Sequence, residues 1–352
     1  MLPYWILFLI PALGVLAPYR LTPASRPLMW WLVGSLFALA IGLRFEVGTD
    51  WWAYLAYLDR ASAMTLFEVL MSEDPGYYLL NWLAVNLGGN IHWVNLICGA
   101  IVMIGVVVFS RDQPLPWLAL MVAVPYLIIV VAMGYTRQAV ALGFILLGLV
   151  ALSDGRVRIF VAWVLIGAAF HKSAVLMLPL AGLAASQSRV TSMAWAGVAT
   201  LIGGYLFLFD SADQLWTNYV EADYQSEGGL IRVLMNAVPA VLFLVLQRYL
   251  QLNEDERRLW WWLSVLAIAC IPLVMMSSTA TDRVALYLIP LQIFVFARLP
   301  LICLDSRWST LIVLSVVAYY AAVLLVWLMF ALNAQQWLPY QSVLSMDASV
   351  GI

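Results

Sequence analysis

Apolar runs separated by short polar hinges follow one another along almost the whole chain. They predict helices near residues 3–18, 28–43, 91–110, 115–132, 135–152, 158–170, 172–185, 191–209, 230–250, 259–276, 284–299 and 309–331. A helix that crosses a bilayer needs about 20 apolar residues, so the short runs 158–170 and 172–185 are expected to be tilted or broken. The short run 76–88 is expected to be an interfacial or re-entrant helix. The pattern predicts an all-α polytopic membrane protein with about 12 transmembrane helices.

Composition agrees with this class. The 352 residues are 65% hydrophobic and 10% charged, whereas soluble domains average about a quarter charged residues. We expect one membrane domain over residues 1–352, with outer loops at 44–75 and 210–229. The three cysteines have no metal-like spacing and there are only two histidines, so no metal site is expected.

The positive charges of the hinges predict an orientation. Under the span list most of the 17 Lys and Arg residues fall on one face, which we assign to the cytoplasm: Arg20, Arg26, Arg111, Arg156, Arg158, Arg189, Arg248, Arg257, Arg258, Arg298 and Arg307. Both termini then lie outside. This count requires that 76–88 does not cross and that the region around His171 is a hairpin of two half-helices.

The remaining cations occupy unusual places. Five of them lie at span edges or within apolar sequence, where a charge costs several kcal/mol unless it has a partner or a polar cavity: Arg44, Arg137, Lys172, Arg232 and Arg283. Guanidinium groups bind phosphate oxygens bidentately and stay charged, so a convergent set of outer arginines predicts a phosphate-bearing ligand.

A local alternative exists for several of these arginines. Each could pair with a carboxylate that is near in sequence: Arg44 with Glu46, Arg283 with Asp282, and Arg60 with Asp59. Such pairs would make the arginines structural.

Three residues are candidates for a general base. An imidazole with an ordinary pKa near 6.5 suits proton abstraction at neutral pH, which favours His171, and the adjacent Lys172 would lower that pKa further. The alternative is that His171 only bonds a neighbouring helix. Asp50 and Glu73 are the other candidates, although Asp50 or Thr49 could cap a helix. Glu73 could likewise belong to a helix start with proline at its first position.

No standard nucleotide-binding or catalytic motif is present. The sequence lacks a Walker loop, GxGxxG, GxSxG, HExxH and a DxD-like cluster. A cytosolic nucleotide donor is therefore not expected, and nothing predicts nucleic-acid binding. A reaction at the outer face, on a substrate that carries its own leaving group, fits better. Interleaved acids and aromatics in 210–229 are compatible with sugars or with an ordinary solvated loop.

An ordered series of short motifs carries a family resemblance. The motifs are RFEVGTD (44–50) with Tyr54 and Tyr57, EDPGYYLLN (73–81), YTRQAVALGF (135–144), AFHKSAVLMLP (169–179), GGLIR (228–232), TDRVALY (281–287) and WLPYQSVL (337–344). In this order they resemble the EpsG family of bacterial polysaccharide polymerases, a branch of the Wzy-type enzymes.

The resemblance implies a glycosyltransferase-C-like fold in the bacterial inner membrane, with an active site that faces the periplasm. Such enzymes join undecaprenyl-diphosphate-linked oligosaccharide repeat units for O-antigen, capsule or exopolysaccharide, without a cofactor, alongside membrane lipid, flippase and chain-length regulator proteins. The implied diphosphate ligands are Arg137, Arg232, Arg283 and Arg44. Further substrate contacts are expected from Gln138, Lys172, Asp282 and Tyr340, with Asp282 also orienting Arg283.

Three other classes share some of these features. An O-antigen-ligase-like glycosyltransferase would use the same lipid donor with another acceptor. A membrane-bound O-acyltransferase would also use a buried histidine, but no companion motif is present. A lipid-linked oligosaccharide transporter would need cations accessible from both faces and internal repeats, and neither is found.

Overall fold

The computed structural model describes residues 1–17, 25–184, 197–198, 201, 228–303 and 305–345. Within these ranges the secondary structure is helical, and the β pairing found is one isolated bridge between Arg44 and Ser342. The expected all-α class is therefore confirmed for the described part of the chain. Most of the predicted span 191–209 and most of the loop 210–229 lie outside the described residues.

The helices follow the predicted apolar runs closely. In chain order they are α1 (Leu2–Leu16), α2 (Ser25–Gly42), α3 (Trp51–Ser62), α4 (Leu66–Leu70), α5 (Pro75–Asn86), α6 (Ile91–Arg111), α7 (Pro116–Ala123), the π-helix η1 (Val124–Ala132), α8 (Thr136–Ser153), α9 (Val157–Ala168), the 3₁₀ helix η2 (Lys172–Met177), α10 (Pro179–Ala184), α13 (Gly229–Leu246), α14 (Glu254–Met276), α15 (Ser278–Leu286), α16 (Ile289–Phe296), the 3₁₀ helix η5 (Leu299–Ile302), α17 (Ser306–Phe330), and the 3₁₀ helices η6 (Leu332–Gln336) and η7 (Val343–Ser345).

Fewer helices than expected are long enough to cross a membrane alone. Among the described residues, five helices are long and apolar enough, namely α6, α8, α13, α14 and α17. A sixth span results if α15 and the segment Ile289–Ile302 count as one helix bent by 45°. These helices make the chain a polytopic membrane protein. The figure of about 12 spans stays a prediction, because the other apolar helices offer only 10–17 residues each, with α2 counted from Pro27.

The most apolar segments lie at the centre. In α8, 78% of the membrane-length window is buried within the protein, against 22% in α17. All nine residues of η1 are also buried. A helix that is hydrophobic all round belongs inside a bundle, whereas α17 presents most of its surface to the surroundings. α8 is therefore a central helix of the bundle, and the side chains at its ends are fixed by the surrounding packing.

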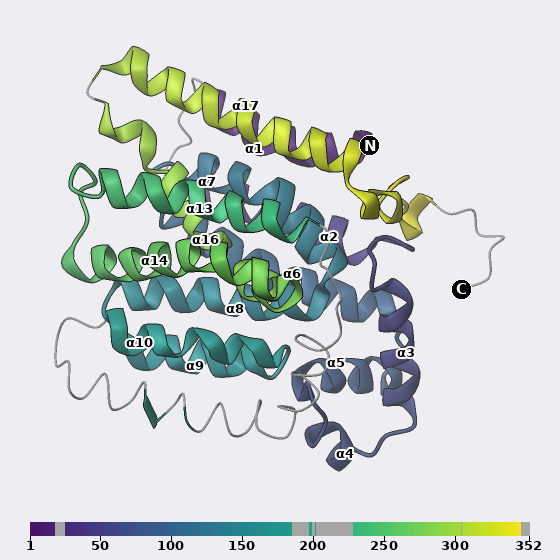
Figure 1. Cartoon of the computed structure of the whole chain (residues 1–352). Coiled ribbons are helices and arrows are strands. Elements are labelled where there is room, and N and C mark those ends of the chain that lie inside the picture. Colours follow the sequence, from purple (N-terminus) through teal and green to yellow (C-terminus); the bar gives the residue numbers. More distant parts are fainter. Residues whose placement is uncertain (18–24, 185–196, 199–200, 202–227, 304, 346–352) are drawn as a thin grey trace.

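One end of the bundle gathers several short elements. The helices run across Figure 1, and α3, α4, α5 and the N-terminus lie together at one end. The C-terminal segment joins them, because the Tyr4 hydroxyl donates to the Trp337 carbonyl over 2.6 Å and the Phe45 amide donates to the Gln341 carbonyl over 3.0 Å. The Trp337 indole reaches further inward and donates to the Ile129 carbonyl of η1 over 2.9 Å.

Candidate functional site

The same end of the bundle holds a set of charged side chains that we call the charged cluster. Six of its members lie in the first turn of a helix or just before it, whereas Asp282 and Arg283 lie beyond the first turn of α15. The members share electrostatic neighbours, and they are Asp50, Asp74, Arg137, His171, Lys172, Arg232, Asp282 and Arg283. Helix N-termini carry a partial positive charge, so the backbone adds to the attraction that the cations offer an anion.

A glycine brings Asp50 into the cluster. Gly48 has φ +104°, and a Cβ at this position would lie 2.3 Å from the Met133 carbonyl oxygen. Only glycine permits both this backbone conformation and this close approach. The loop before α3 therefore lies directly against the junction of η1 and α8, and Asp50 follows two residues later.

Asp50 precedes α3, as its predicted capping role required. Its carboxylate makes no side-chain capping bond, however. Its electrostatic neighbours are Arg283 and Arg137. Burial raises the pKa of Asp50 above its ordinary value, and the two arginines oppose that rise. A carboxylate with a raised pKa is a better proton acceptor than one in water.

A second close approach positions Asp74. The Gly76 amide donates to the Ala169 carbonyl over 2.7 Å, and a Cβ on Gly76 would lie 3.0 Å from that oxygen. The start of α5 thus packs against the end of α9. As expected from Pro75, this is a helix start with proline in its first turn, but the Asp74 side chain does not cap it.

The Asp74 carboxylate instead links two other elements. One oxygen accepts a hydrogen bond from Arg137 Nη1 over 2.5 Å, and the other accepts from the Lys172 backbone amide over 3.3 Å. The Arg137 guanidinium also lies 4.6 Å from the centre of the Tyr57 ring. The buried carboxylate therefore holds Arg137 beside the Tyr57 ring, while the Arg137 side chain as a whole stays 24% exposed.

His171 lies where the helical path breaks. Its backbone is extended (φ −155°, ψ 109°) between α9 and η2, so the predicted break at this residue is confirmed. Its Nδ1 is buried and has no hydrogen-bond partner among the described residues. Burial, assisted by Arg137, Arg283 and Lys172, holds the pKa of His171 well below its ordinary value. The imidazole is neutral at pH 7 and can accept a proton.

Arg283 donates to a neutral side chain, whereas Arg137 and Arg232 are paired with carboxylates. Its Nη1 donates to Gln138 Oε1 over 3.3 Å, and Gln138 Nε2 donates back to the Arg283 carbonyl over 2.8 Å. The guanidinium lies 5.1 Å from the centre of the Tyr135 ring. Among the described residues Arg283 forms no ion pair within 4.0 Å.

Asp282 pairs with a different arginine from the one expected. Its carboxylate contacts the Arg232 guanidinium of α13, whereas its sequence neighbour Arg283 turns to Gln138. The expectation that Asp282 orients Arg283 is corrected accordingly. Successive residues of a helix point about 100° apart, so adjacent side chains rarely meet.

Glu73 lies at the edge of the cluster. Its side chain is 61% exposed and its Oε2 is 3.7 Å from Lys172 Nζ. The other base candidates are more enclosed, so Glu73 is the one best exposed to solvent.

Arg44 and Tyr340 lie outside the accessible part of the cluster. Arg44 is 0% exposed, and its guanidinium donates to the carbonyls of Ile41 and Val47 and to the Thr136 hydroxyl over 2.8 Å. These contacts tie the end of α2 and the following loop to α8. The Tyr340 hydroxyl donates to the Ala40 carbonyl over 2.8 Å. Both residues therefore have structural contacts at the end of α2, next to the charged cluster.

The sequence reading missed two partners that the structure makes prominent. Asp74 and Tyr135 enter the sequence-based expectations only as members of the motifs at 73–81 and 135–144. An acid beside a predicted cationic site was the available signal for Asp74. Among the described residues no group of three or more His, Cys, Asp or Glu side chains has a metal-binding arrangement.

An all-helical membrane bundle with an arginine-rich cluster at one end defines the class of this protein. The chain matches the EpsG family over residues 28–342, and it belongs to that family. The suspected resemblance is thus confirmed, and the family indicates a role in polysaccharide polymerisation. No curated protein and no solved structure matches the chain.

Proposed function

We propose that this protein is a glycosyltransferase that joins undecaprenyl-diphosphate-linked oligosaccharide repeat units at the periplasmic face of the inner membrane. The observation that carries the proposal is the convergence of Arg137 and Arg283 on Asp50 and His171. The two arginines can bind and stabilise a diphosphate leaving group. Asp50 or His171 can take the proton from an acceptor hydroxyl. Family membership supports the polymerase activity.

The three arginines of the charged cluster have different roles in binding the diphosphate. Arg283 is the principal ligand, because the residue is partly exposed and, among the described residues, the contacts of its guanidinium are with the neutral side chains of Gln138 and Tyr135. Arg137 contributes its accessible edge while Asp74 holds it in place. Arg232 reinforces the positive potential beside Tyr135. Fixed positive groups of this kind stabilise the charge that develops on a departing diphosphate.

His171 is the proposed general base, with Asp50 as the alternative. The base takes the proton of the acceptor hydroxyl as its oxygen attacks the anomeric carbon of the donor. The bond between that carbon and the diphosphate oxygen breaks, and undecaprenyl diphosphate leaves with both bonding electrons. His171 is neutral at pH 7, as a general base must be before the step, and the anionic diphosphate of the bound donor offsets the three cations that lower its pKa and weaken it as a proton acceptor.

Reconstitution tests the activity. The purified protein in liposomes, given lipid-linked repeat units alone, should produce a ladder of lipid-linked polymers. Unchanged single repeats in the presence of a separate glycan acceptor, with transfer to that acceptor, would identify a ligase instead. Movement of the lipid-linked unit between leaflets without bond formation would identify a transporter.

Cysteine accessibility tests the face. Glu68 on α4 and Glu254 at the start of α14 are both exposed and lie at opposite ends of the bundle. In a background without the native cysteines, a membrane-impermeant reagent on intact spheroplasts should label E68C and spare E254C. The reverse result would place the charged cluster at the cytoplasmic face and contradict the proposal.

A further inference from the structure

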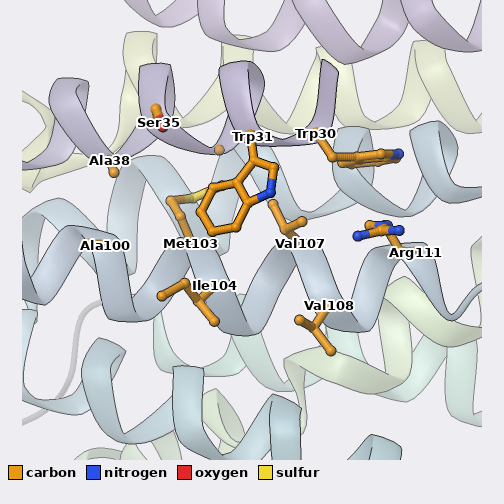
Figure 2. A pocket seen from close by; sticks show the side chains of 11 residues that line it. Trp30, Trp31, Ser35, Ala38, Ala100, Met103, Ile104, Val107, Val108 and Arg111 are labelled. Carbon is orange, nitrogen blue, oxygen red and sulfur yellow. The ribbon is translucent and has the colours of Figure 1, made fainter. Parts of the chain in front are cut away.

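A groove between α2 and α6 lies on the flank of the bundle, away from the charged cluster. It has a volume of about 290 Å³. Figure 2 shows its lining, in which an apolar surface from both helices ends at one cationic side chain; the residues used below are Trp30, Trp31, Gly34, Ser35, Val107 and Arg111.

The groove opens outward from the protein. Trp31 is 70% exposed, whereas Trp30 is buried and stacks on Trp117 with ring centres 4.7 Å apart. Trp30 therefore belongs to the floor and Trp31 to the rim. Gly34 leaves the middle open, because a Cβ there would already lie 3.3 Å from Val107 Cγ2. In a bilayer a shaped apolar groove gains mainly by van der Waals contact, so an extended hydrocarbon chain is the matching occupant.

Among the described residues that line the groove, Arg111 is the one cation, and it marks the end of the groove. Arg111 closes α6, whose 21 residues span about 30 Å, so it lies at the opposite membrane surface from the charged cluster. It is exposed and, among the described residues, forms no ion pair within 4.0 Å. In Figure 2 it lies next to Trp30 at one end of the lining. Arginine binds phosphate oxygens, and indoles favour the headgroup level.

We infer that the groove binds a phospholipid with an anionic headgroup, with an acyl chain between α2 and α6 and the phosphate at Arg111. The charge favours this lipid over a polyprenyl diphosphate. One exposed guanidinium matches a single phosphodiester, whereas the several cations that suit a diphosphate are gathered about 30 Å away at the other end of the bundle. The site does not depend on the proposed glycosyl transfer.

Photo-crosslinking of the full chain in nanodiscs tests the inference. The probe is phosphatidylglycerol with a diazirine in one acyl chain, diluted into phosphatidylcholine, and the comparison is the matching phosphatidylcholine probe. Peptides containing residues 31–35 and 104–108 should be labelled about fivefold more by the anionic probe, as expected for one arginine near a headgroup. R111Q should remove that preference, and R307Q, at an exposed arginine in the first turn of α17, should not.

Blocking the groove provides the second measurement. Ser35 is exposed on α2, so S35F should fold and obstruct the groove, which lowers labelling by both probes. Its control is S315F at an exposed serine on α17. Equal labelling by the two probes in the unaltered protein, or labelling unaffected by R111Q, would overturn the inference. Displacement of the probe by undecaprenyl diphosphate but not by phosphatidylglycerol would overturn it in favour of the other lipid. If S35F does not fold, the R111Q comparison decides alone.

Discussion

Both ends of the bundle contain partly buried arginines, but the partners of these arginines differ. At the end opposite the charged cluster, Arg298 donates to Glu256 over 3.1 Å and to Gln113. Its guanidinium also lies 3.7 Å from the centre of the Phe294 ring. In the charged cluster, Arg283 contacts Gln138 and Tyr135 and has no carboxylate within ion-pair distance among the described residues.

The difference separates a structural arginine from a reactive one. The charge of Arg298 is balanced by Glu256 and its donors face protein acceptors, so this residue stabilises the fold. Arg283 retains positive charge that a bound anion can balance. Sequence position did not distinguish them, because both lie near the ends of apolar runs. The identity of the partners across the bundle makes the distinction.

The largest effect is expected at His171. H171Q should lower polymerisation about 10²–10⁴-fold while the protein stays folded, because the amide cannot take up the acceptor proton. The chain offers a matched control in His92, which is half-buried and packs against Phe45 and Trp51 outside the charged cluster. H92Q should retain most of the activity. Initial rates on purified, monodisperse variants provide the measurement. Near-normal chain growth by H171Q would transfer the base role to Asp50.

The next effect is expected at Arg283. R283A should lower the rate about 10²–10³-fold, as is typical when one group that stabilises a developing anion is removed. R283K should be nearly as damaging, since lysine keeps the charge but loses the planar fork that binds two phosphate oxygens. Both variants should match the parent in yield and thermal unfolding. Full polymer length with R283K would show that this position supplies only a diffuse positive charge.

The helix pattern was readable from the sequence because membrane helices are long apolar runs. The hinge at 133–134, between the predicted spans 115–132 and 135–152, and the break at His171 were visible as interruptions of those runs. The expectation of a short helix at 76–88 agrees with α5. Local sequence determines such features, since every backbone polar group in a bilayer must be satisfied within its own helix.

The pairings within the site were not readable in this way. Asp74 and Arg137 are 63 positions apart, and Arg232 and Asp282 are 50 apart. Such contacts depend on which helices become neighbours, which periodicity does not specify. Arg44 illustrates the opposite error: its position at the end of an apolar run made it resemble a ligand residue, yet its donors are directed at backbone carbonyls and at Thr136.

Removal of Arg298 should affect stability rather than catalysis. R298A leaves Glu256 without its partner, and breaking a largely buried pair costs about 3–5 kcal/mol. We expect a lower unfolding temperature and a lower yield in detergent, with a near-normal rate per folded molecule. A stable R298A protein that has lost polymerisation would contradict the structural assignment. It would show that Arg298, like Arg283, is needed for activity.

The pH dependence of the rate tests the state of His171. Its pKa is lowered by burial and by the neighbouring cations, so the imidazole stays neutral as the pH falls through 6.5, the ordinary value for histidine. The rate should therefore change little between pH 8 and 6.5 and fall only at lower pH. Measurements on liposomes buffered equally on both sides avoid gradients. An acidic limb centred at or above pH 6.5 would show that the base is not held in this environment.

The smallest effect is expected at Glu73, which is the most exposed of the three base candidates. Its contact with Lys172 is a 3.7 Å ion pair, and such exposed pairs contribute about 0.2–1 kcal/mol. E73Q should thus change the rate by no more than about fivefold, since 1.4 kcal/mol corresponds to a factor of ten. D74N is the informative contrast, because Asp74 is buried and its carboxylate holds both Arg137 and the Lys172 amide. D74N should lower the rate more than E73Q does, and it should do so through weaker binding of the lipid-linked donor. If E73Q instead abolishes chain growth in a well-folded protein, Glu73 is the base, and the role of His171 is structural.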